Sequence, residues 1–218
     1  MNDIYYKDLK IKYIYIKTLK NTYIGVSKDL DITIKTPSKS TRFIDELIQK
    51  KELWIRKQIL KIKQNPPQKI NLEDEVLLFG EVCSLDIDEA KELREFLYRI
   101  RSDSTQAVLR CYDRYYKLKS DRYLIPRVEY WQEIMSLRYD NIKFKKMKSM
   151  WGNCSSKKVI TLNTQLIKIK KELIDYVIVH ELAHLVHMNH SKDFHTLVEK
   201  YLPHAKLLRK ELKNINLS

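Results

Sequence analysis

The residues best suited to chemistry lie close together in the C-terminal third of the chain. Residues 177–190 contain four of its six histidines and one glutamate, in the sequence VIVHELAHLVHMNH. Most of the other residues in this stretch are apolar, which predicts a helix that runs through the protein core. Burying two imidazole rings and a carboxylate without partners would cost on the order of several kcal/mol. A divalent metal ion bound to these side chains would remove that cost.

His180 and His184 have the spacing of two zinc ligands on one helix. Residues four apart project from the same helical face with Cβ atoms ~5–6 Å apart, which suits one tetrahedral zinc ion. Glu181 points about 100° around the helix, where its carboxylate can meet a water molecule bound to zinc. Zinc lowers the pKa of that water to about 7, and a glutamate can take the proton as the hydroxide attacks a carbonyl carbon. The H-E-x-x-H motif therefore predicts a zinc-dependent hydrolase, against the alternative of a hydrogen-bonded histidine pair in the core.

A third zinc ligand is expected after this motif, because a catalytic zinc ion has three protein ligands and one open position. Four residues could provide it: His187, His190, His195 and Glu199. If the helix continues past His184, His187 lies about 10 Å along the axis from His180 and cannot share the ion. Asn189 can adopt the left-handed conformation that ends a helix, so a chain that turns back there would bring His190 to the metal. We therefore predict His190 as the third ligand, with His195 and Glu199 as solvent-facing residues of the next helix.

The composition is that of a globular protein with a hydrophobic core. Of the 218 residues, 44% are hydrophobic and 32% are charged. No apolar run approaches the ~18–20 residues of a membrane span, and the N-terminal residues lack the features of a signal peptide, so we expect a cytoplasmic protein. The three cysteines, Cys83, Cys111 and Cys154, include no C-x-x-C pair, which argues against a disulfide framework or a cysteine zinc site. Three glycines are too few for a phosphate-binding loop or a dinucleotide fingerprint.

The net charge of +14, from 42 Lys and Arg against 28 Asp and Glu, is typical of proteins that bind nucleic acids or other polyanions. The lysines are spread evenly along the chain, however, which favours a general bias in composition over a dedicated binding surface. We therefore expect at most weak, non-specific and salt-sensitive binding to nucleic acid.

Residues 1–90 are predicted to form an N-terminal region of sheet and helix. Alternating, β-rich segments separated by turns predict a small antiparallel sheet, with strands over residues 9–17, 22–27 and 31–36. Apolar residues at helical spacing predict a helix from Thr41 that ends at the Pro66-Pro67 pair. Residues 75–87 are typical of a hairpin that turns near Gly80. A domain boundary is expected near residue 90.

Residues 91–218 are predicted to form the catalytic domain. Residues 88–137 are expected to be mostly helical, because their apolar and aromatic residues recur at loosely helical spacing. Breaks in this helical region are expected near residues 102–104 and before Pro126, since proline interrupts the helical hydrogen bonds.

Two strands are predicted before the metal-binding helix, over residues 142–148 and 158–169, on either side of the loop SMWGNCSSK. The metal-binding helix is expected to begin at Lys171. The sequence SKDFHTLVEKYL then predicts a short helix with an apolar face made of Phe194, Leu197, Val198 and Tyr201.

The second half of the chain resembles the YgjP-like family of bacterial zinc metallopeptidases, through the segments MWGNCSS, ITLN, HELAH and NHSKDF in this order and at this spacing. It is more distantly similar to the SprT-like proteases, which degrade proteins crosslinked to DNA. The resemblance is strongest over residues 147–203, and the preceding sheet and helix are also similar. It implies an α+β fold: a minimal zincin-like metallopeptidase domain with an N-terminal antiparallel sheet plus helix, in which the active-site helix lies under a short sheet whose edge strand holds substrate. It also implies that His180, His184 and His190 are zinc ligands and that Glu181 is the catalytic acid and base.

Two positions depart from the pattern of this family. The family's loop usually reads W-G-S-C-S, whereas this chain has Asn153 in place of the first serine, and His195 replaces the aromatic residue that commonly follows the phenylalanine. Candidates for the substrate cleft are Trp151, Asn153, Cys154, His187 and His195. For Trp151 and Cys154, packing beneath the metal-binding helix is the favoured role. The sequence identifies no residue that would stabilise an oxyanion.

The leading interpretation is a zinc metallopeptidase of the H-E-x-x-H type that cleaves a protein or peptide. A first alternative is a metal-dependent nucleotide phosphohydrolase or pyrophosphatase, because activated water could attack phosphorus and a basic chain suits nucleoside triphosphates. A second alternative is a nucleic-acid-binding protein with a structural zinc ion, which predicts a closed site with four ligands and no role for Glu181. Against this alternative, no fourth Cys or His ligand is evident near the helix.

Overall fold

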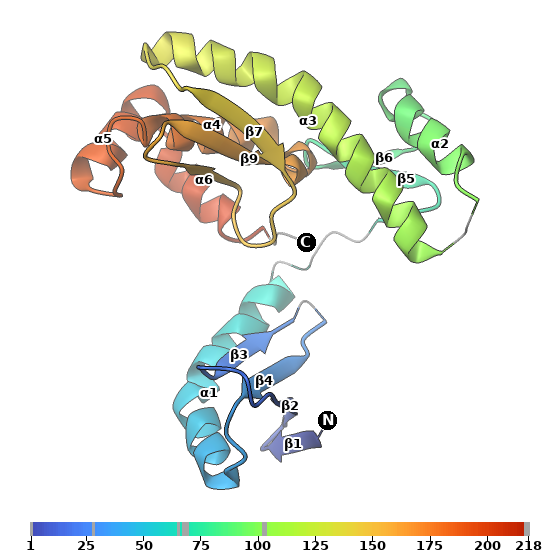
Figure 1. The fold of residues 1–218 in the computed structure, drawn as a ribbon, viewed down its shortest axis with the longest axis vertical. Coiled ribbons are helices and arrows are strands. Elements are labelled where there is room, and N and C mark those ends of the chain that lie inside the picture. Colours follow the sequence, from blue (N-terminus) through green and yellow to red (C-terminus); the bar gives the residue numbers. More distant parts are fainter. Residues whose placement is uncertain (1, 28, 65, 67–69, 102–103, 216–218) are drawn as a thin grey trace. The chain divides into compact units, whose positions relative to one another are not determined.

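The computed structural model of the chain describes residues 2–27, 29–64, 66, 70–101 and 104–215. These residues form an α+β fold, as predicted, and divide into two compact units, residues 1–68 and 69–218 (Figure 1). Among the described helices, none has both the length and the apolar character that a membrane span requires.

The first unit is a four-stranded sheet packed against one helix. The strands are β1 (Asn2–Tyr6), β2 (Leu9–Tyr15), β3 (Tyr23–Val26) and β4 (Ile32–Thr36), in the order β1-β2-β4-β3. The helix, α1 (Thr41–Gln64), begins at the predicted residue and ends before Pro66. Alternate residues of the central strands pack against residues at helical spacing on α1, and together they form a small core of Leu9, Ile11, Ile32, Ile34, Ile44, Ile48 and Ile55.

The sheet contains a strand that was not predicted, β1, and two of its three strand pairs have the expected antiparallel direction. β1 with β2 and β3 with β4 are antiparallel, whereas β2 and β4 are parallel, with Ile11 beside Ile32. The chain reverses direction after β2 and again after β3, and β4 lies between those two strands, so β4 runs in the same direction as β2. The alternation in the sequence predicts which residues face the core but does not predict which strands are neighbours.

The second unit begins with the predicted hairpin, which comprises β5 (Glu75–Leu78) and β6 (Glu81–Ser84). The two turn residues, Phe79 and Gly80, both have positive φ, 50° and 91°, as in a tight type I′ hairpin turn. Their N–H groups donate to the carbonyl oxygens of Ile167 and Lys168 at 2.8 and 3.1 Å. The tip of the hairpin is therefore fixed to the segment that precedes the predicted metal-binding helix.

The division between the two units falls between residues 68 and 69, not near the predicted boundary at residue 90. The hairpin and the segment that follows it contribute buried side chains to the core of the second unit, among them Val76, Leu78, Leu85 and Ala90. The hairpin packs with the second unit because its apolar face is buried there, which the strand pattern alone does not reveal.

Two α-helices follow the hairpin, after the short 3-10 helix η1 (Asp88–Ala90): α2 (Lys91–Tyr98) and α3 (Thr105–Met135). Ser104 caps α3, because its side-chain oxygen accepts a hydrogen bond from the N–H of Ala107 at 3.3 Å. Residues 102–103, where a break is predicted, lie outside the described residues.

The predicted break before Pro126 is wrong, because α3 continues through this residue. Proline usually interrupts a helix, since it lacks an N–H group and its ring clashes with the preceding turn. Here Pro126 is exposed, whereas Leu124, Val128 and Trp131 of the same helix are buried in the core. Burial of these residues on both sides of the proline stabilises the continuous helix.

The sheet of the second unit has three strands in the order β7-β9-β8: β7 (Asn141–Lys145), β8 (Gly152–Cys154) and β9 (Val159–Asn163). β8 lies inside the predicted loop and pairs antiparallel with β9. The strand predicted over residues 158–169 ends early, at Asn163, and the 3-10 helix η2 (Thr164–Lys168) follows it. The Asn163 side chain accepts a hydrogen bond from the N–H of Gln165 at 3.1 Å, which stabilises the turn out of the strand.

Three helices complete the second unit: α4 (Lys171–Ala183), α5 (Lys192–Tyr201) and α6 (Ala205–Leu212). α4 contacts α3, α5, α6, β8 and β9, so it is surrounded by other elements, as its apolar sequence predicts. Phe194 and Val198, from the predicted apolar face of α5, are buried. α6 has no counterpart among the predicted elements.

Candidate metal centre

The predicted metal-binding helix, α4, ends earlier than the sequence indicates. Its last residue is Ala183, and His184 is its C-cap residue. The N–H of His187 donates to the carbonyl oxygen of Ala183 at 3.0 Å, in a turn that follows the helix. The prediction of a helix that continues to His187 is therefore wrong. The early end of α4 lets the chain turn back, so that His190 returns to the helix.

The structure brings together the three histidines that the sequence predicts as ligands. One ring nitrogen from each of His180, His184 and His190 lies within 4.8 Å of the others. The Nε2 atoms of His180 and His190 are 3.0 Å apart. The buried ring of Phe194 lies 4.8, 4.6 and 4.9 Å from the ring centroids of His180, His184 and His190. The three imidazoles are thus gathered against one aromatic side chain at the start of α5.

The geometry of this histidine cluster fits a zinc ion. Two nitrogens bound to tetrahedral zinc at about 2.0–2.1 Å are roughly 3.3 Å apart, and the Nε2 atoms of His180 and His190 are separated by a similar distance. His184 Nδ1 lies 3.0 Å from the carbonyl oxygen of His187, and donation to this oxygen leaves Nε2 of His184 with its lone pair. Burial, followed by the neighbouring histidines, lowers the pKa of His180 to about 3, and burial also lowers the pKa of His190. Both rings are therefore neutral, which is the form that binds metal ions.

Glu181 lies beside the histidine cluster and is buried. The residue is only 5% exposed, and its Oε2 atom has no hydrogen-bond partner among the described residues. Burial raises the pKa of Glu181 to about 8. Because buried polar atoms are nearly always hydrogen-bonded, an unpartnered carboxyl oxygen next to three histidines indicates a site for a bound group.

The backbone of β8 passes directly against Glu181. A Cβ atom added at Gly152 would lie 2.7 Å from Oε1 of Glu181 and 2.8 Å from its Cγ atom. A side chain at this position would therefore displace the carboxylate, and only glycine allows the strand to approach so closely. This contact gives the glycine of the W-G-N-C segment a physical role.

A buried asparagine holds the loop that leads into β8. Asn163 Nδ2 donates to the carbonyl oxygens of Met147 and Met150, both at 2.8 Å, and its Oδ1 atom accepts from the N–H of Met147 at 3.3 Å. The N–H of Asn163 also donates to the carbonyl oxygen of Trp151 at 2.9 Å. These bonds position Trp151 and Gly152. In the sequence, Asn163 is singled out only as the last residue of the ITLN segment. The one local sign of its role is that it is a polar residue at the end of an apolar strand.

A first cavity, of about 350 Å³, lies beside Glu181. Trp151 and Gly152 contribute to its walls, as do Tyr176 and His180 of α4. The volume is within the lower part of the range for ligand pockets, roughly 300–1,000 Å³. The candidate base and one candidate ligand therefore open into a space that can hold part of a substrate.

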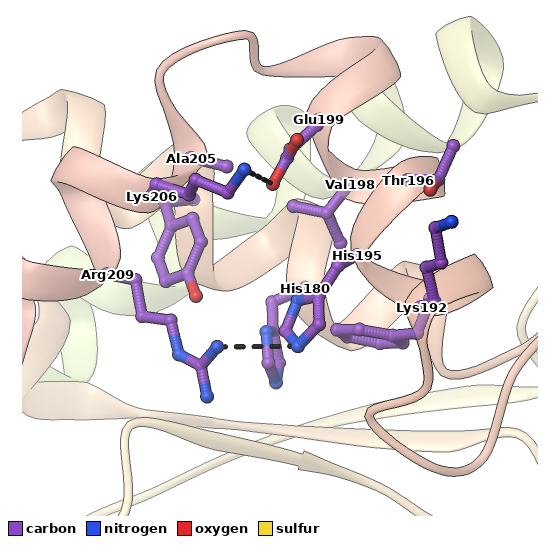
Figure 2. Close-up of a pocket in the computed structure, with 11 residues that line it drawn as sticks. His180, Lys192, His195, Thr196, Val198, Glu199, Ala205, Lys206 and Arg209 are labelled. Carbon is purple, nitrogen blue, oxygen red and sulfur yellow. Dashed lines mark hydrogen bonds and ion pairs between the residues drawn. The ribbon is translucent and has the colours of Figure 1, made fainter.

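A second cavity, of about 280 Å³, has walls from α4, α5 and α6 and shares His180 and Arg209 with the first. Arg209 extends towards His195, and its Nη1 atom lies 3.4 Å from His195 Nε2 (Figure 2). Arg209 was not among the predicted site residues, because α6 was not predicted. No local signal in the sequence distinguishes it from the many other basic residues.

The five residues expected near the cleft fall into two groups. Trp151 lines the first cavity and His195 lines the second, whereas Asn153, Cys154 and His187 line neither. Asn153 is exposed, and its Nδ2 atom contacts the Met150 sulfur at 3.5 Å. Burial, followed by the charge of Glu181, raises the pKa of Cys154 to about 11, so its thiol is neutral and unsuited to be a nucleophile. His187 contributes its carbonyl oxygen to the site, through the bond to His184.

The sequence matches the model of the YgjP-like metallopeptidase domain over residues 20–215. Two solved structures, both metallopeptidase zymogens, are similar to part of the chain. Abylysin from Pyrococcus abyssi is 24% identical, with 43% of this chain and 97% of abylysin covered and a TM-score of 0.38. Jannalysin from Methanocaldococcus jannaschii is 24% identical, with 40% of this chain and 90% of jannalysin covered and a TM-score of 0.36. No curated protein is significantly similar to the chain.

The family match extends over most of the chain and includes every residue of the histidine cluster, Glu181 and the strand packed against it. A divalent metal ion is implied by this family, and the three converging histidines could hold one. The substrates of a peptidase are proteins or peptides. The chain belongs to the YgjP-like family of metallopeptidase domains, which makes it a metal-dependent peptidase.

Proposed function

We propose that the protein is a zinc metallopeptidase in which His180, His184 and His190 bind zinc and Glu181 is the catalytic acid and base. The observation that carries this proposal is the buried, unpartnered Oε2 atom of Glu181, next to three converging histidines. In the part of the chain that the structure describes, no fourth His, Cys, Asp or Glu joins these histidines. A set of three ligands favours a catalytic site with an open position over a closed structural site.

Zinc bound there would supply a Lewis acid for the peptide carbonyl group and a positive charge that returns Glu181 to its ionised form. The protein's own residues prepare the site for this chemistry. The carbonyl oxygen of His187 fixes the orientation and tautomer of the His184 ring. The buried Phe194 ring covers one side of the three imidazoles and keeps water away from it.

Glu181 performs the proton transfers in this proposal. We assign the reaction to its Oε2 atom, which is buried and has no hydrogen-bond partner among the described residues. Oε2 accepts a proton from a water molecule as that water attacks the carbonyl carbon of the peptide bond. The protonated carboxyl group then donates the proton to the leaving nitrogen as the C–N bond breaks.

The proposal is tested by Glu181→Gln, which preserves the size of the side chain and removes the base. Hydrolysis of casein and of internally quenched peptides should fall by about 10²–10⁴-fold, the usual contribution of general acid–base catalysis, while zinc content stays at one ion per chain. Glu133→Gln, which neutralises an exposed carboxylate on α3, is the matched control and should keep the wild-type rate. A wild-type rate in Glu181→Gln would contradict the proposed role, and phosphate release from nucleoside triphosphates without peptide cleavage would indicate a phosphohydrolase.

A further inference from the structure

The walls of the second cavity carry more cations than carboxylates. Lys192, Lys206 and Arg209 line it, together with a single carboxylate, that of Glu199. Glu199 forms an ion pair with Lys206 at 3.4 Å. Within the described parts of the chain, no carboxylate lies within ion-pair distance of Lys192 or Arg209. Two positive charges in this cavity are therefore left uncompensated by the protein.

Arg209 is exposed at the wall of the cavity and contacts His195. Its Nη1 atom lies 3.4 Å from His195 Nε2, and because a guanidinium group can only donate, the imidazole nitrogen is the acceptor. Figure 2 shows Arg209 directed towards the labelled rings of His180 and His195. The guanidinium thus retains most of its donors for another group.

An unpaired arginine next to a site for a divalent cation is electrostatically unfavourable by itself, because like charges at short range repel. A negatively charged group on the substrate would compensate both Arg209 and Lys192. Arginine suits a carboxylate in particular, since its planar guanidinium can donate two parallel hydrogen bonds to the two oxygens. The cavity volume of about 280 Å³ is enough for one residue of a peptide.

We propose that this cavity binds a carboxylate group of the peptide substrate, next to the cleaved bond, and that Arg209 determines this specificity. The proposal rests on the proposed function, because Arg209 and His180 border both cavities and a peptide bound at the metal centre would extend from one to the other. The carboxylate can come from an Asp or Glu side chain or from the C-terminus of the peptide. Both sources present the same chemistry to the guanidinium group.

Four internally quenched peptides separate the two sources. They share one sequence, have Glu or Gln beside the cleaved bond, and end in a free or an amidated C-terminus. For a side-chain carboxylate, kcat/KM of the zinc-loaded wild-type protein should be about tenfold higher with Glu than with Gln, the effect of one charge-assisted hydrogen bond. For a terminal carboxylate, the same ratio should separate free from amidated peptides. Equal rates with all four peptides would overturn the proposal.

The variant Arg209→Met removes the charge and retains an unbranched apolar stem. The preference for the carboxylate peptide should fall to a ratio near one through a higher KM for that peptide, and Arg209→Lys should restore part of the preference. Lys210→Met is the matched control, because Lys210 is exposed on the same helix and lines neither cavity. The same loss in Lys210→Met, or an equal drop in kcat for every peptide in Arg209→Met, would contradict a carboxylate subsite at Arg209.

A binding measurement distinguishes failure of this proposal from failure of the proposed function. The four peptides, labelled with a fluorophore, are titrated with zinc-loaded Glu181→Gln protein and with the Glu181→Gln, Arg209→Met double variant. In one outcome, the double variant loses a carboxylate preference that the single variant shows in binding, while the wild-type protein cleaves none of the peptides. That result would support the carboxylate-binding site and contradict the peptidase function. Cleavage of the peptides without any carboxylate preference in rate or binding would contradict the carboxylate-binding site and leave the peptidase function supported.

Discussion

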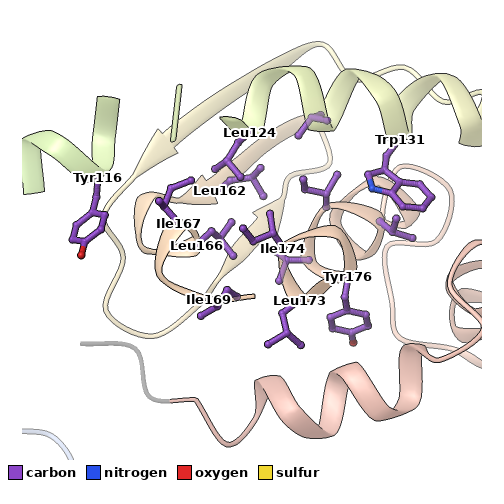
Figure 3. Packing of buried hydrophobic residues seen from close by; sticks show 14 of the residues in the cluster. Tyr116, Leu124, Trp131, Leu162, Leu166, Ile167, Ile169, Leu173, Ile174 and Tyr176 are labelled. Atoms are coloured by element: carbon purple, nitrogen blue, oxygen red, sulfur yellow. The ribbon is translucent and has the colours of Figure 1, made fainter. Parts of the chain in front are cut away.

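Two acidic residues on α4 lie in opposite environments. Asp175, near the start of the helix, accepts hydrogen bonds from Arg127 Nε and Nη2 at 2.5 and 2.6 Å and from Trp131 Nε1 at 3.1 Å. Glu181, less than two turns later, is more deeply buried and has one oxygen without a partner among the described residues. Trp131 extends from α3 into the same packed region as Ile174 of α4 (Figure 3).

This difference indicates that α4 has two separate roles, one in the stability of the fold and one in activity. The Asp175 pair joins α4 to α3, and a satisfied polar group at a helix contact contributes to stability. The unpartnered oxygen of Glu181 makes the folded state less stable, because a buried polar atom has lost its contacts with water. Buried polar atoms without partners occur where function requires an open hydrogen-bonding position. The comparison therefore predicts that changes near Glu181 affect activity and changes at Asp175 affect folding.

The largest effect on activity outside the ligands and Glu181 is expected for Gly152→Ala. The added Cβ atom would lie 2.7 Å from Oε1 of Glu181 and push the carboxylate out of position. A displacement of about 1 Å in a catalytic group can lower the rate by roughly 10²-fold. Gly25→Ala is the control, because a Cβ atom there meets nothing within 4 Å. Equal rates of peptide hydrolysis by Gly152→Ala and Gly25→Ala would contradict the expectation that changes near Glu181 affect activity.

A smaller effect, on stability, is expected for Asp175→Asn. The amide cannot accept both hydrogen bonds of the Arg127 fork, so we expect the free energy of unfolding in urea to fall by about 1–3 kcal/mol. The folded fraction should retain the wild-type rate of peptide hydrolysis. Asp121→Asn removes a more exposed carboxylate, which pairs with Lys117, and should change the free energy of unfolding by about 0–1 kcal/mol. Loss of activity in folded Asp175→Asn protein would show that the two roles of α4 are not separate.

The sequence predicts best those features that depend on neighbours along the chain. The spacing of His180, Glu181 and His184 places them on one helix, and α1 and the β5–β6 hairpin follow from local periodicity and turn residues. The return of His190 was predicted from the turn-forming character of Asn189, although α4 ends six residues before it.

The features that were missed depend on contacts between distant segments. β8 has only three residues, and it is a strand because it pairs with β9. α3 passes through Pro126 because residues on both sides are buried against other elements. Arg209 becomes a site residue only because α6 packs against α4 and α5. In each case the sequence gives the local preference, and tertiary packing overrides or completes it.

The most direct test of the metal centre is a zinc titration of the wild-type protein, His190→Ala and His187→Ala, with zinc content and melting temperature measured for each. The wild-type protein should bind one zinc ion and melt at a higher temperature with it, because a ligand that binds only the folded state stabilises that state. The zinc affinity of His190→Ala should fall by more than roughly 10–100-fold, the loss that is typical when a residue that only hydrogen-bonds a metal ligand is replaced. His187→Ala should retain nearly all of its affinity, since its carbonyl oxygen, not its ring, contacts His184. Loss of zinc in His187→Ala with retention in His190→Ala would contradict the assignment of the three ligands.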